Sequence, residues 1–485
     1  MEPLPVHIFR AYDVRGLAPD EITPAVAQRI GRAYGRLIEE RFDLRRVVVG
    51  RDNRPTSPAL HAALIDGVRG AGLDVIDIGE APSPLLYYAA ADWGAGGVSV
   101  TASHNPTRYN GFKLLERAGI PLSPDEIQEV RARADQDVSP EHWPTGRGGL
   151  RRRDPMASYL ALLEQRFPLL RPLRIAVDPG NGVATLTGPP ALRRIGARVT
   201  AINSASNGGC PDHPLDPAHP ESIAALGAHL LSEHADIGFG WDGDGDRLSV
   251  VDELGMHHNA DAVLAVLARD LLRRRPGARI LVDVKMSLTA IDTIEAAGGR
   301  VCMGPTGHSL IKRRMRDSRD APSADRPAFL LAGEGTGHFY FAEDYFGLDD
   351  AVYAACALAR IVAESGGPAS ALFENLPVYV TSPEFTIPCP DARKHEIAAA
   401  IGAYFRPRHP VLTVDGARVD FGDGWAVIRA SNTSPALSVR LEARSAAAYA
   451  GIRDAVLRAL HSHPELESPE AALADVSNGG EVGRG

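Results

Sequence analysis

The stretch RRVVVGRDNRPTSPALHAALIDGVRGAGLDVIDIG (45–79) contains the structural unit from which we predict the fold class. It begins with a short β-branched run that ends at Asp52, and it continues with a helix-like segment over 58–72. A glycine turn and a second apolar run over 73–79 close it. Strand, helix and strand in this order predict a βαβ unit, in which the two strands pair in parallel and the helix covers the sheet.

The same unit occurs twice more along the chain. LRIAVDPGNG (173–182) and ARILVDVKMS (278–287) are each followed by a helix-like segment, a glycine turn and another apolar run. The first strand of every unit ends in an aspartate, which is Asp52, Asp178 or Asp283. Three copies spaced about a domain apart predict three related α/β domains, which we place at 1–150, 151–254 and 255–366.

The rest of the chain has a different pattern. Residues 367–465 contain short strand-like runs and one helix-like segment over 446–462, which predict a smaller α+β domain. Residues 466–485 are polar and glycine-rich, and we expect this tail to be disordered.

The composition excludes several classes of protein. The 485 residues are 44% hydrophobic and carry a net charge of −9, which indicates a globular protein and argues against a nucleic-acid partner. A membrane helix needs about 18 consecutive apolar residues, and the chain has no such run. Its first residues lack the pattern of a signal peptide, and its four cysteines form no CxxC pair. We therefore expect a cytoplasmic protein without a membrane partner, a zinc site or a disulfide framework.

Lysine is unusually rare. Lysine and arginine together number 52, but only four of these residues are lysine, at 113, 285, 312 and 394. Lysine is a compact charge that can lose its proton, which arginine cannot do. Each lysine alone is equally well explained as a surface residue, but a chain that uses so few raises the alternative that they serve a chemical purpose.

The segment HADIGFGWDGDGDRLSVVDELG (234–255) predicts two strands joined by an acidic loop. Asp242, Asp244 and Asp246 alternate with glycines, so their carboxylates can face one point, where their repulsion requires a cation. Three hard oxygen ligands that leave room for a phosphate oxygen favour Mg²⁺.

Two alternatives to this metal loop stay open. An EF-hand also has aspartates at positions 1, 3 and 5, and Glu253 falls at position 12. However, Arg247 stands where the EF-hand turn needs glycine, and the flanking segments look like strands. The other alternative is a solvated acidic hairpin.

The run VSVTASHNP (98–106) predicts a strand that stops at a turn. The β-branched part ends at Thr101, and Ser103, His104 and an Asn-Pro pair follow it. Asn-Pro is a common turn signal, so an ordinary turn is the simplest interpretation.

The segment LLAGEGTGHFYF (330–341) places Glu334, Thr336 and His338 on a glycine-rich loop between two strands. Hydrogen-bonding groups of mixed polarity suit a sugar hydroxyl, which both donates and accepts. A plain turn explains this motif equally well.

The segment WAVIRASNTSPALSVRLEA (425–443) sets four polar side chains after a strand, namely Arg429, Ser431, Asn432 and Thr433. Successive backbone N–H groups in such a turn form an anion-binding nest, and arginine can meet a phosphate with two parallel hydrogen bonds. The loop is therefore a candidate phosphate site.

The chain resembles the α-D-phosphohexomutase superfamily in four motifs that occur in the same order, namely TASHNP, DGDGDR, GEGTGH and RASNTS. The opening FRAYDVRG (9–16) resembles its bacterial phosphomannomutase/phosphoglucomutase branch, and the resemblance extends to about residue 465. It implies mixed sheets in the three α/β domains and a central cleft. It also implies an isomerase, an intramolecular phosphotransferase, that interconverts hexose 1-phosphate and 6-phosphate of mannose, glucose or both. The reaction would pass through a phosphoserine and a hexose 1,6-bisphosphate, which also serves as activator.

The resemblance implies a role for each motif residue. Ser103 would be the phosphoserine and would complete the site of one Mg²⁺ per chain, together with Asp242, Asp244 and Asp246. Glu334, Thr336 and His338 would hold sugar hydroxyls, and Arg429, Ser431, Asn432 and Thr433 would hold the phosphate that is not transferred. Further catalytic positions would be Arg15, His104, Lys113, Arg247 and His308, with His308 handling a proton, and further substrate-binding positions would be Tyr12 and Lys285.

Other functions remain open at this point. A phosphoglucosamine mutase would share these motifs, and a phosphatase could use Asp242 as nucleophile, although Asp246 stands where such enzymes usually have Thr or Val. A third alternative is a protein that binds sugar phosphates without turnover. Bacterial members commonly have a larger residue at Gly335 and serine at Thr336, which leaves the preferred hexose open. We expect small-molecule hexose phosphates as partners and a monomer or homodimer.

Overall fold

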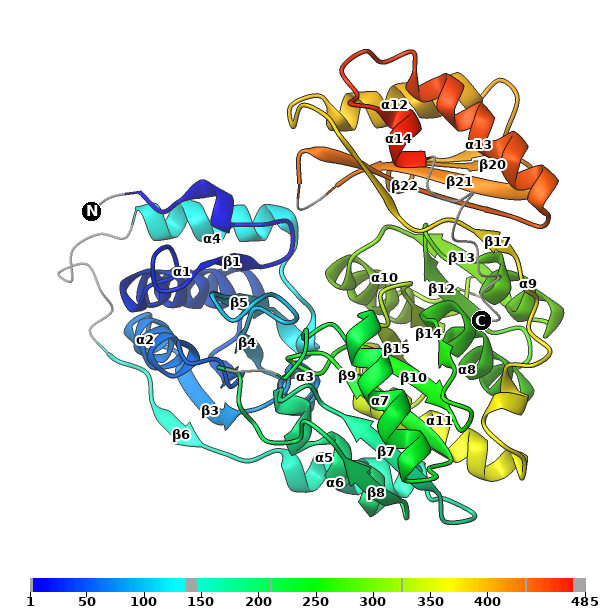
Figure 1. Ribbon diagram of the computed structural model, residues 1–485. Coiled ribbons are helices and arrows are strands. Elements are labelled where there is room, and N and C mark those ends of the chain that lie inside the picture. Colours follow the sequence, from blue (N-terminus) through cyan, green and yellow to red (C-terminus); the bar gives the residue numbers. More distant parts are fainter. Residues whose placement is uncertain (1–2, 137–145, 210–211, 324–325, 432–433, 474–485) are drawn as a thin grey trace. The chain divides into compact units, whose positions relative to one another are not determined.

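The computed structural model describes residues 3–136, 146–209, 212–323, 326–431 and 434–473 (Figure 1). The chain divides into two compact units. The first comprises Met1–Ala260, Lys312–Leu331 and Thr336–Glu374, and the second comprises Asp261–Ile311, Ala332–Gly335 and Asn375–Gly485.

The first sheet has six strands in the order β1-β5-β4-β2-β3-β6. Strand β2 is parallel to β3 and β4, whereas β5 is antiparallel to β4 and β1, so the sheet is mixed. Helix α1 packs against α2 and α4, as Figure 1 shows. The strands are β1 Val14–Leu17, β2 Arg46–Arg51, β3 Asp74–Glu80, β4 Gly96–Val100, β5 Tyr109–Leu115 and β6 Leu150–Arg152, and the helices are α1 Pro24–Phe42, α2 Ser57–Gly70, α3 Ser83–Asp92 and α4 Pro124–Asp135.

The second sheet has the order β11-β10-β9-β7-β8. Strand β7 is parallel to β8 and β9, and β9 and β10 form an antiparallel hairpin. The acidic loop is the turn of this hairpin, so strands flank it as predicted and an EF-hand is excluded. The strands are β7 Arg174–Asp178, β8 Arg198–Ala201, β9 Ile237–Trp241, β10 Leu248–Asp252 and β11 His257–His258, and the helices are α5 Met156–Arg166, α6 Gly188–Arg194 and α7 Pro220–Ser232.

The third sheet has the order β13-β12-β14-β15-β16, with β12 and β13 parallel and β15 and β16 antiparallel. The pairs β2/β3, β7/β8 and β12/β13 are the three βαβ units predicted from sequence, and the prediction of three mixed-sheet α/β domains is confirmed. The strands are β12 Arg279–Asp283, β13 Arg300–Gly304, β14 Phe329–Gly333, β15 Phe339–Phe341 and β16 Leu348–Asp349, and the helices are α8 Ala260–Arg274, α9 Leu288–Ala296, α10 His308–Asp320 and α11 Ala351–Ser365.

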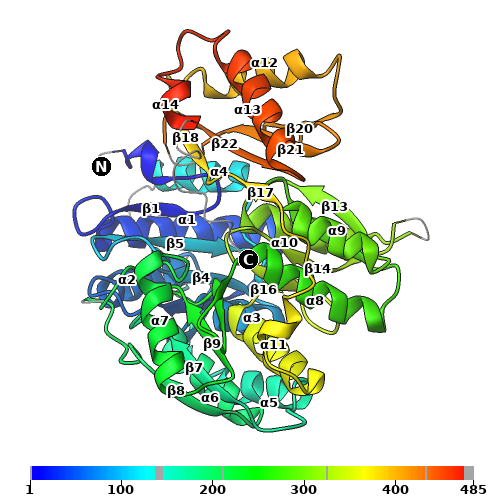
Figure 2. The same ribbon diagram turned by 45° about the vertical axis from the view of Figure 1, so that its right-hand side comes forward.

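The C-terminal domain is an antiparallel sheet in the order β17-β22-β21-β20-β19, with β18 also paired to β22. Figures 1 and 2 both show α12 and α13 on one face of this sheet. Helix α13 is the predicted one, whereas α12 was not predicted. The strands are β17 Val380–Thr381, β18 Phe385–Pro388, β19 Val411–Leu412, β20 Ala417–Asp420, β21 Gly424–Ala430 and β22 Ala436–Ala443, and the helices are α12 Lys394–Phe405, α13 Ala446–Leu460 and α14 Pro469–Leu473.

The expectation of disorder in 466–485 is wrong for its first part. Leu466 and Leu473 are 7% and 1% exposed and belong to the core of the C-terminal domain, and Leu473 is the last residue of α14. The burial of these two apolar side chains orders an otherwise polar segment. Residues 474–485 lie outside the described residues. Within the part of the chain that is described, no helix is long and apolar enough to cross a membrane.

A fully buried ion pair lies in the interior of the first unit. Lys312 Nζ lies 2.7 Å from Asp349 Oδ1, and both side chains are 0% exposed. The ammonium also lies 3.7 Å from the centroid of the Tyr87 ring. Burial lowers the pKa of Lys312 and raises the pKa of Asp349, and each partner opposes the shift of the other. The pair is therefore sensitive to the loss of either member.

Lys312→Met should lower the free energy of unfolding by about 3–5 kcal/mol, because Asp349 would remain as an uncompensated buried charge. Chemical denaturation measures the change, and the double variant with Asp349→Leu should recover much of it. Arg194→Met, which removes the partner of Glu164 on the surface, is the control and should cost about 1 kcal/mol or less. Equal losses in Lys312→Met and Arg194→Met would contradict the prediction.

Candidate active site

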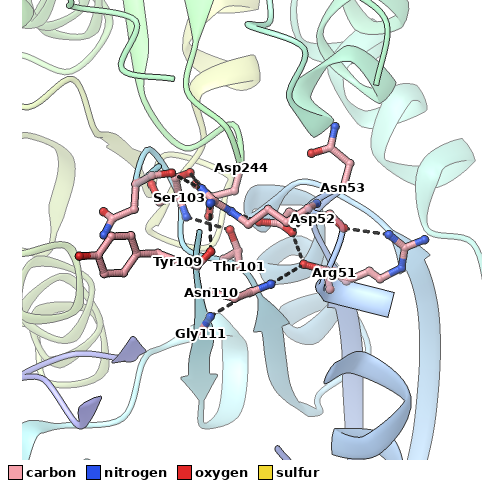
Figure 3. A network of polar contacts seen from close by, with 12 residues as sticks. Arg51, Asp52, Asn53, Thr101, Ser103, Tyr109, Asn110, Gly111 and Asp244 are labelled. Carbon is pink, nitrogen blue, oxygen red and sulfur yellow. Dashed lines mark hydrogen bonds and ion pairs between the residues drawn. The ribbon is translucent and has the colours of Figure 1, made fainter. Parts of the chain in front are cut away.

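Ser103 lies in a turn after β4 and has an unusual backbone conformation. Its φ is +51°, in the left-handed region, which costs a residue other than glycine about 1–2 kcal/mol. Its N–H donates to Thr101 Oγ1 at 2.9 Å, and its Oγ donates to Asp242 Oδ2 at 2.8 Å. Figure 3 shows Thr101, Ser103 and Asp244 close together. The turn thus directs a hydroxyl that is buried, with 4% of the residue exposed, at the acidic loop.

The acidic loop folds back on its own first carboxylate. Asp242 Oδ1 accepts the N–H groups of Asp246 at 3.0 Å and Arg247 at 3.1 Å. Gly245 has a φ of +77°, which a side chain would disfavour. All three aspartates are 1% exposed or less. The predicted convergence of three carboxylates is present, because their ligand atoms all lie within 4.8 Å of one another.

Lys113 on β5 partly neutralises this loop. Its Nζ lies 2.6 Å from Asp244 Oδ2 and 2.5 Å from Asp246 Oδ2. Burial disfavours the Lys113 cation, but Asp244 and Asp246 outweigh it and raise the pKa of Lys113 well above its ordinary value. Burial, together with repulsion from Asp246 and Asp244, raises the pKa of Asp242 to about 8. The ammonium of Lys113 therefore neutralises the acidic loop only in part.

The residues present fit a divalent cation. Asp244 Oδ1 is buried and has no hydrogen-bond partner among the described residues, because Lys113 and Ser83 both bind Oδ2. An orphaned carboxylate oxygen beside two further carboxylates is the donor set that Mg²⁺ and Ca²⁺ prefer. The buried Asp242, Asp244 and Asp246 cluster is thus consistent with a metal site.

Ser83, which sequence reasoning missed, orients Asp244 from the first turn of α3. Its N–H donates to the Asp244 carbonyl at 2.9 Å, and its Oγ donates to Asp244 Oδ2 at 2.5 Å. The prolines on either side of Ser83 are a helix-start signal. That signal could have located the helix, but it could not have identified the loop that the helix meets.

Arg15 and His104 both lie at the Ser103 turn. Arg15 Nη1 donates to Asn105 Oδ1 at 2.9 Å, and His104 Nδ1 lies 3.3 Å from Ser103 Oγ. Burial, followed by the charges of Arg247 and Arg15, lowers the pKa of His104 to about 2. The imidazole therefore stays neutral at ordinary pH and is a poor proton acceptor.

Two further predicted residues belong to the same unit. Arg247 follows the acidic loop, and its Nη1 lies 4.0 Å from Asp216 Oδ2. Tyr12 is half-buried in the segment that precedes β1.

The loop after β14 contributes to both units. His338 Nε2 lies 3.3 Å from Asp246 Oδ1, and His338 Nδ1 lies 2.9 Å from Thr336 Oγ1. Gly337, at a φ of +90°, accepts the N–H of Leu248 at 3.1 Å. Thr336 and His338 thus join the acidic loop in the first unit, whereas Glu334 belongs to the second unit.

In the second unit, Glu334, His308 and Arg429 are linked through the main chain at 306–307. The N–H of Gly307 donates to Glu334 Oε1 at 2.7 Å. The N–H of Thr306 donates to Asp415 Oδ2 at 3.1 Å. The same Asp415 oxygen accepts from Arg429 Nε at 3.1 Å. His308 follows directly as the first residue of α10. Residues predicted to bind sugar and phosphate therefore share one hydrogen-bonded chain.

Lys285 also lies in the second unit, and its partner Glu384 was not predicted. Lys285 Nζ lies 2.8 Å from Glu384 Oε2, and Ser438 Oγ donates to the other oxygen of Glu384. Burial disfavours the Glu384 carboxylate, but the Lys285 charge and the hydrogen bonds outweigh it and lower the pKa of Glu384.

Ser431 is the described part of the candidate phosphate loop. Its N–H donates to the Ala436 carbonyl at 2.9 Å, and its own carbonyl accepts from Lys394 Nζ at 2.7 Å. Asn432 and Thr433 lie outside the described residues.

Three of the four lysines are buried. Lys113, Lys285 and Lys312 are 7% exposed or less, and each binds a carboxylate. The surface interpretation is therefore wrong for these three, which stand where a compact ammonium fits. Lys394 is half-buried, and its Nζ binds the Ser431 carbonyl and the exposed Asp391.

Comparison with known proteins identifies the family. The four phosphoglucomutase/phosphomannomutase domains match in order: α/β/α domain I over 6–141, domain II over 157–255, domain III over 259–379 and the C-terminal domain over 384–459. The phosphomannomutase/phosphoglucomutase of Pseudomonas aeruginosa is 38% identical over 442 residues, which cover 91% of this chain and 92% of that protein.

Solved structures agree with this match. The crystal structure of a phosphoglucomutase/phosphomannomutase family protein from Burkholderia thailandensis superimposes with a TM-score of 0.85 at 36% identity, over 94% of this chain and 97% of that one. The Aspergillus fumigatus N-acetylphosphoglucosamine mutase in complex with GlcNAc-6P and magnesium shares the fold, with a TM-score of 0.59 at 14% identity over 95% and 96% of the two chains. The chain belongs to the bacterial phosphomannomutase/phosphoglucomutase group of the α-D-phosphohexomutase superfamily, and it is an enzyme of that group.

Proposed function

We propose that this mutase interconverts hexose 1-phosphate and hexose 6-phosphate through a phosphoserine at Ser103 and a hexose 1,6-bisphosphate. One observation carries the proposal: Ser103 Oγ lies 2.8 Å from Asp242 Oδ2, in a buried site that also holds Asp244, Asp246 and Lys113. An oxygen nucleophile fixed beside a cation site and an ammonium is what phosphoryl transfer needs.

In the first half-reaction, a hydroxyl oxygen of the sugar phosphate attacks the phosphorus on Ser103. The new oxygen–phosphorus bond forms as the bond to Ser103 Oγ breaks, and the hydroxyl proton passes to a base. In the second half-reaction, Ser103 Oγ attacks the phosphorus of the other phosphoryl group of the bisphosphate. The bond from that phosphorus to the sugar oxygen breaks, and the base returns its proton to this oxygen. Lys113 holds its proton in this site and supplies positive charge throughout.

We propose that Asp242, Asp244 and Asp246, with an oxygen of Ser103, hold Mg²⁺. The unpartnered Asp244 Oδ1 and the burial of all three carboxylates support this set. When bound, the ion would withdraw charge from the oxygens of the transferring phosphoryl group. The structure of the distant Aspergillus fumigatus relative contains magnesium, which supports the choice of this ion.

The match to the family's motifs supports the roles of the remaining residues. Arg429, Ser431, Asn432 and Thr433 would hold the phosphate that is not transferred, and Glu334, Thr336 and His338 would hold sugar hydroxyls. Arg15 and Arg247 would stabilise charge, and Tyr12 and Lys285 would contact substrate. His308 would carry the proton, as the resemblance implies, and the low pKa of His104, about 2, is compatible with that role.

The hydrogen bonds of Asp242 argue against a phosphatase that uses this residue as nucleophile. Its Oδ1 accepts two backbone N–H groups, and its Oδ2 accepts Ser103 Oγ and belongs to the proposed cation site, so both oxygens are engaged in holding the site rather than presented to a phosphoryl group. A phosphatase would release inorganic phosphate, which separates it from a mutase in the assay below.

The test is turnover of mannose, glucose and glucosamine 1-phosphates to their 6-phosphates, with and without Mg²⁺ and the matching 1,6-bisphosphate. Mass spectrometry of the Ser103 peptide should show one added phosphoryl group after incubation with the bisphosphate. Release of inorganic phosphate without the isomer, or an unmodified Ser103 peptide, would overturn the proposal. The ratio of kcat/KM values among the sugars identifies the preferred hexose.

Arg429→Lys should raise KM for both the 1-phosphate and the 6-phosphate by roughly tenfold, with a smaller fall in kcat, because lysine cannot form the bidentate contact. Steady-state kinetics in both directions measure it, and Arg453→Lys on α13 of the same domain is the control. A defect confined to one substrate would contradict a phosphate site that both half-reactions share.

A further inference from the structure

Arg54, which no motif singled out, occupies the interior of the Ser103 turn. Its guanidinium donates to four backbone carbonyls of this turn. Nη2 binds the carbonyl of Ser103 at 2.6 Å and that of Asn105 at 2.7 Å. Nη1 binds the carbonyl of Pro106 at 2.9 Å and that of Tyr109 at 3.1 Å. The side chain is 3% exposed, so these bonds form away from water.

Asp52 anchors the arginine at the end of β2. Arg54 Nε donates to Asp52 Oδ2 at 3.0 Å, and the Arg54 N–H donates to Asp52 Oδ1 at 3.1 Å. Ser57 Oγ also donates to Asp52, and Asn110 Nδ2 donates to Ser57 Oγ at 2.9 Å. Figure 3 shows Asp52, Ser103, Tyr109 and Asn110 around this network.

The five side-chain hydrogen bonds of Arg54 equal its number of donors. A guanidinium carries five N–H groups in a fixed plane, and four carbonyls and one carboxylate take them here. Arg54 therefore has no donor left for a substrate phosphate. Lysine, with three donors on one nitrogen, could not span the same set of carbonyls.

These contacts determine the backbone that presents the nucleophile. Ser103 holds a left-handed φ of +51°, and such a conformation persists only where its surroundings fix it. Arg54 binds the Ser103 carbonyl while Thr101 binds the Ser103 N–H, so both sides of the residue are held. The Oγ is then left to point at Asp242.

We propose that Arg54, oriented by Asp52, is a positioning residue that acts through Ser103 and keeps its Oγ in line for phosphoryl transfer. The inference rests on the proposed role of Ser103 as the phosphoryl carrier. Misplacement of a reacting atom by about 1 Å costs on the order of 10² in rate. Loss of the carbonyl contacts should therefore lower kcat and leave substrate binding largely intact.

The experiment compares Arg54→Lys with the wild type. We expect kcat to fall by about 10²-fold, KM to change by less than about threefold, and phosphorylation of Ser103 by hexose 1,6-bisphosphate to slow in parallel. Arg29→Lys is the matched control, since Arg29 Nε and Nη2 donate to the Ala134 carbonyl of the same domain at 3.1 and 2.9 Å. It should lower the melting temperature and leave kcat unchanged.

Two outcomes would overturn the inference. A folded Arg54→Lys with wild-type kcat would do so, and a raised KM at unchanged kcat would assign Arg54 to phosphate binding instead. If Arg54→Lys does not fold, Asp52→Asn is the test: it keeps the arginine, and we expect a fall in kcat of about tenfold at unchanged KM. Unchanged kcat in a folded Asp52→Asn would then overturn the inference.

Failure of the proposed function gives a different result. A wild-type Ser103 peptide that carries no phosphate after bisphosphate treatment would remove the phosphoserine mechanism, and the inference would fall with it. A phosphorylated wild type beside an unimpaired Arg54→Lys would remove the inference alone.

Discussion

Ser103→Ala should abolish mutase turnover, with kcat lowered by about 10⁴-fold or more, because it removes the oxygen that would carry the phosphoryl group between the two proposed half-reactions. The fold should persist. Arg54 and Thr101 hold the turn through the Ser103 backbone, and the side chain contributes mainly the bond to Asp242. Steady-state assays in both directions and thermal unfolding measure the two effects.

Ser222→Ala is the matched control for Ser103→Ala. Ser222 is also a buried serine of the first unit, at 4% exposure, and its Oγ donates to the Pro214 carbonyl at 3.0 Å. Its loss should lower stability by about 1 kcal/mol and leave kcat unchanged. If Ser103→Ala kept its rate within tenfold of the wild type, Ser103 could not be the nucleophile.

Asp244→Asn should lower kcat on the order of 10²-fold and should raise the Mg²⁺ concentration needed for half-maximal activity. Asp244 Oδ2 accepts from Lys113 and Ser83, and Oδ1 is the buried oxygen left for the ion. An asparagine must place its NH₂ group toward either the Lys113 ammonium or the ion. Both orientations replace an attraction with a repulsion.

Isothermal titration of chelator-treated protein with Mg²⁺, together with activity at graded Mg²⁺, measures this effect. Asp216→Asn is the control, since Asp216 is partly exposed and lies 4.0 Å from Arg247 outside the triplet. Unchanged affinity and rate in Asp244→Asn would mean that the hairpin is a plain acidic turn and that the cation site lies elsewhere.

Two helices of the C-terminal part show different limits of sequence analysis. Helix α12 spans Lys394–Phe405, where KHEIAAAIGAYF is rich in residues with high helix propensity, so the pattern could have revealed it. Helix α14, PEAAL over Pro469–Leu473, also has high helix propensity, but five residues are too few to form a helix alone, and their ordering depends on the burial of Leu473 in the C-terminal core. Propensity can be read locally, whereas burial requires the partner surface.

In the candidate active site too, some features follow from local sequence and others from contacts between distant segments. Glycine spacing in the acidic loop predicted the convergence of Asp242, Asp244 and Asp246, because five consecutive residues determine it. The Lys113 contact joins residues 131 positions apart, and only the fold brings β5 to the acidic loop. No local signal identified the contacts of Ser83 with Asp244 or of Arg54 with the Ser103 turn, since these partners lie far along the chain.

The three βαβ units, the acidic triplet and the family of the four motif loops could be read from the sequence, because each depends on spacing within a short segment. Three features required the folded chain: the charge that neutralises the triplet, the burial of Lys113, Lys285 and Lys312, and the contacts that hold Ser103 in its left-handed turn. Such contacts form only after long chain segments close and exclude water. Arg54 donates to four backbone carbonyls. Because every residue carries the same carbonyl group, the sequence does not reveal which ones the arginine binds.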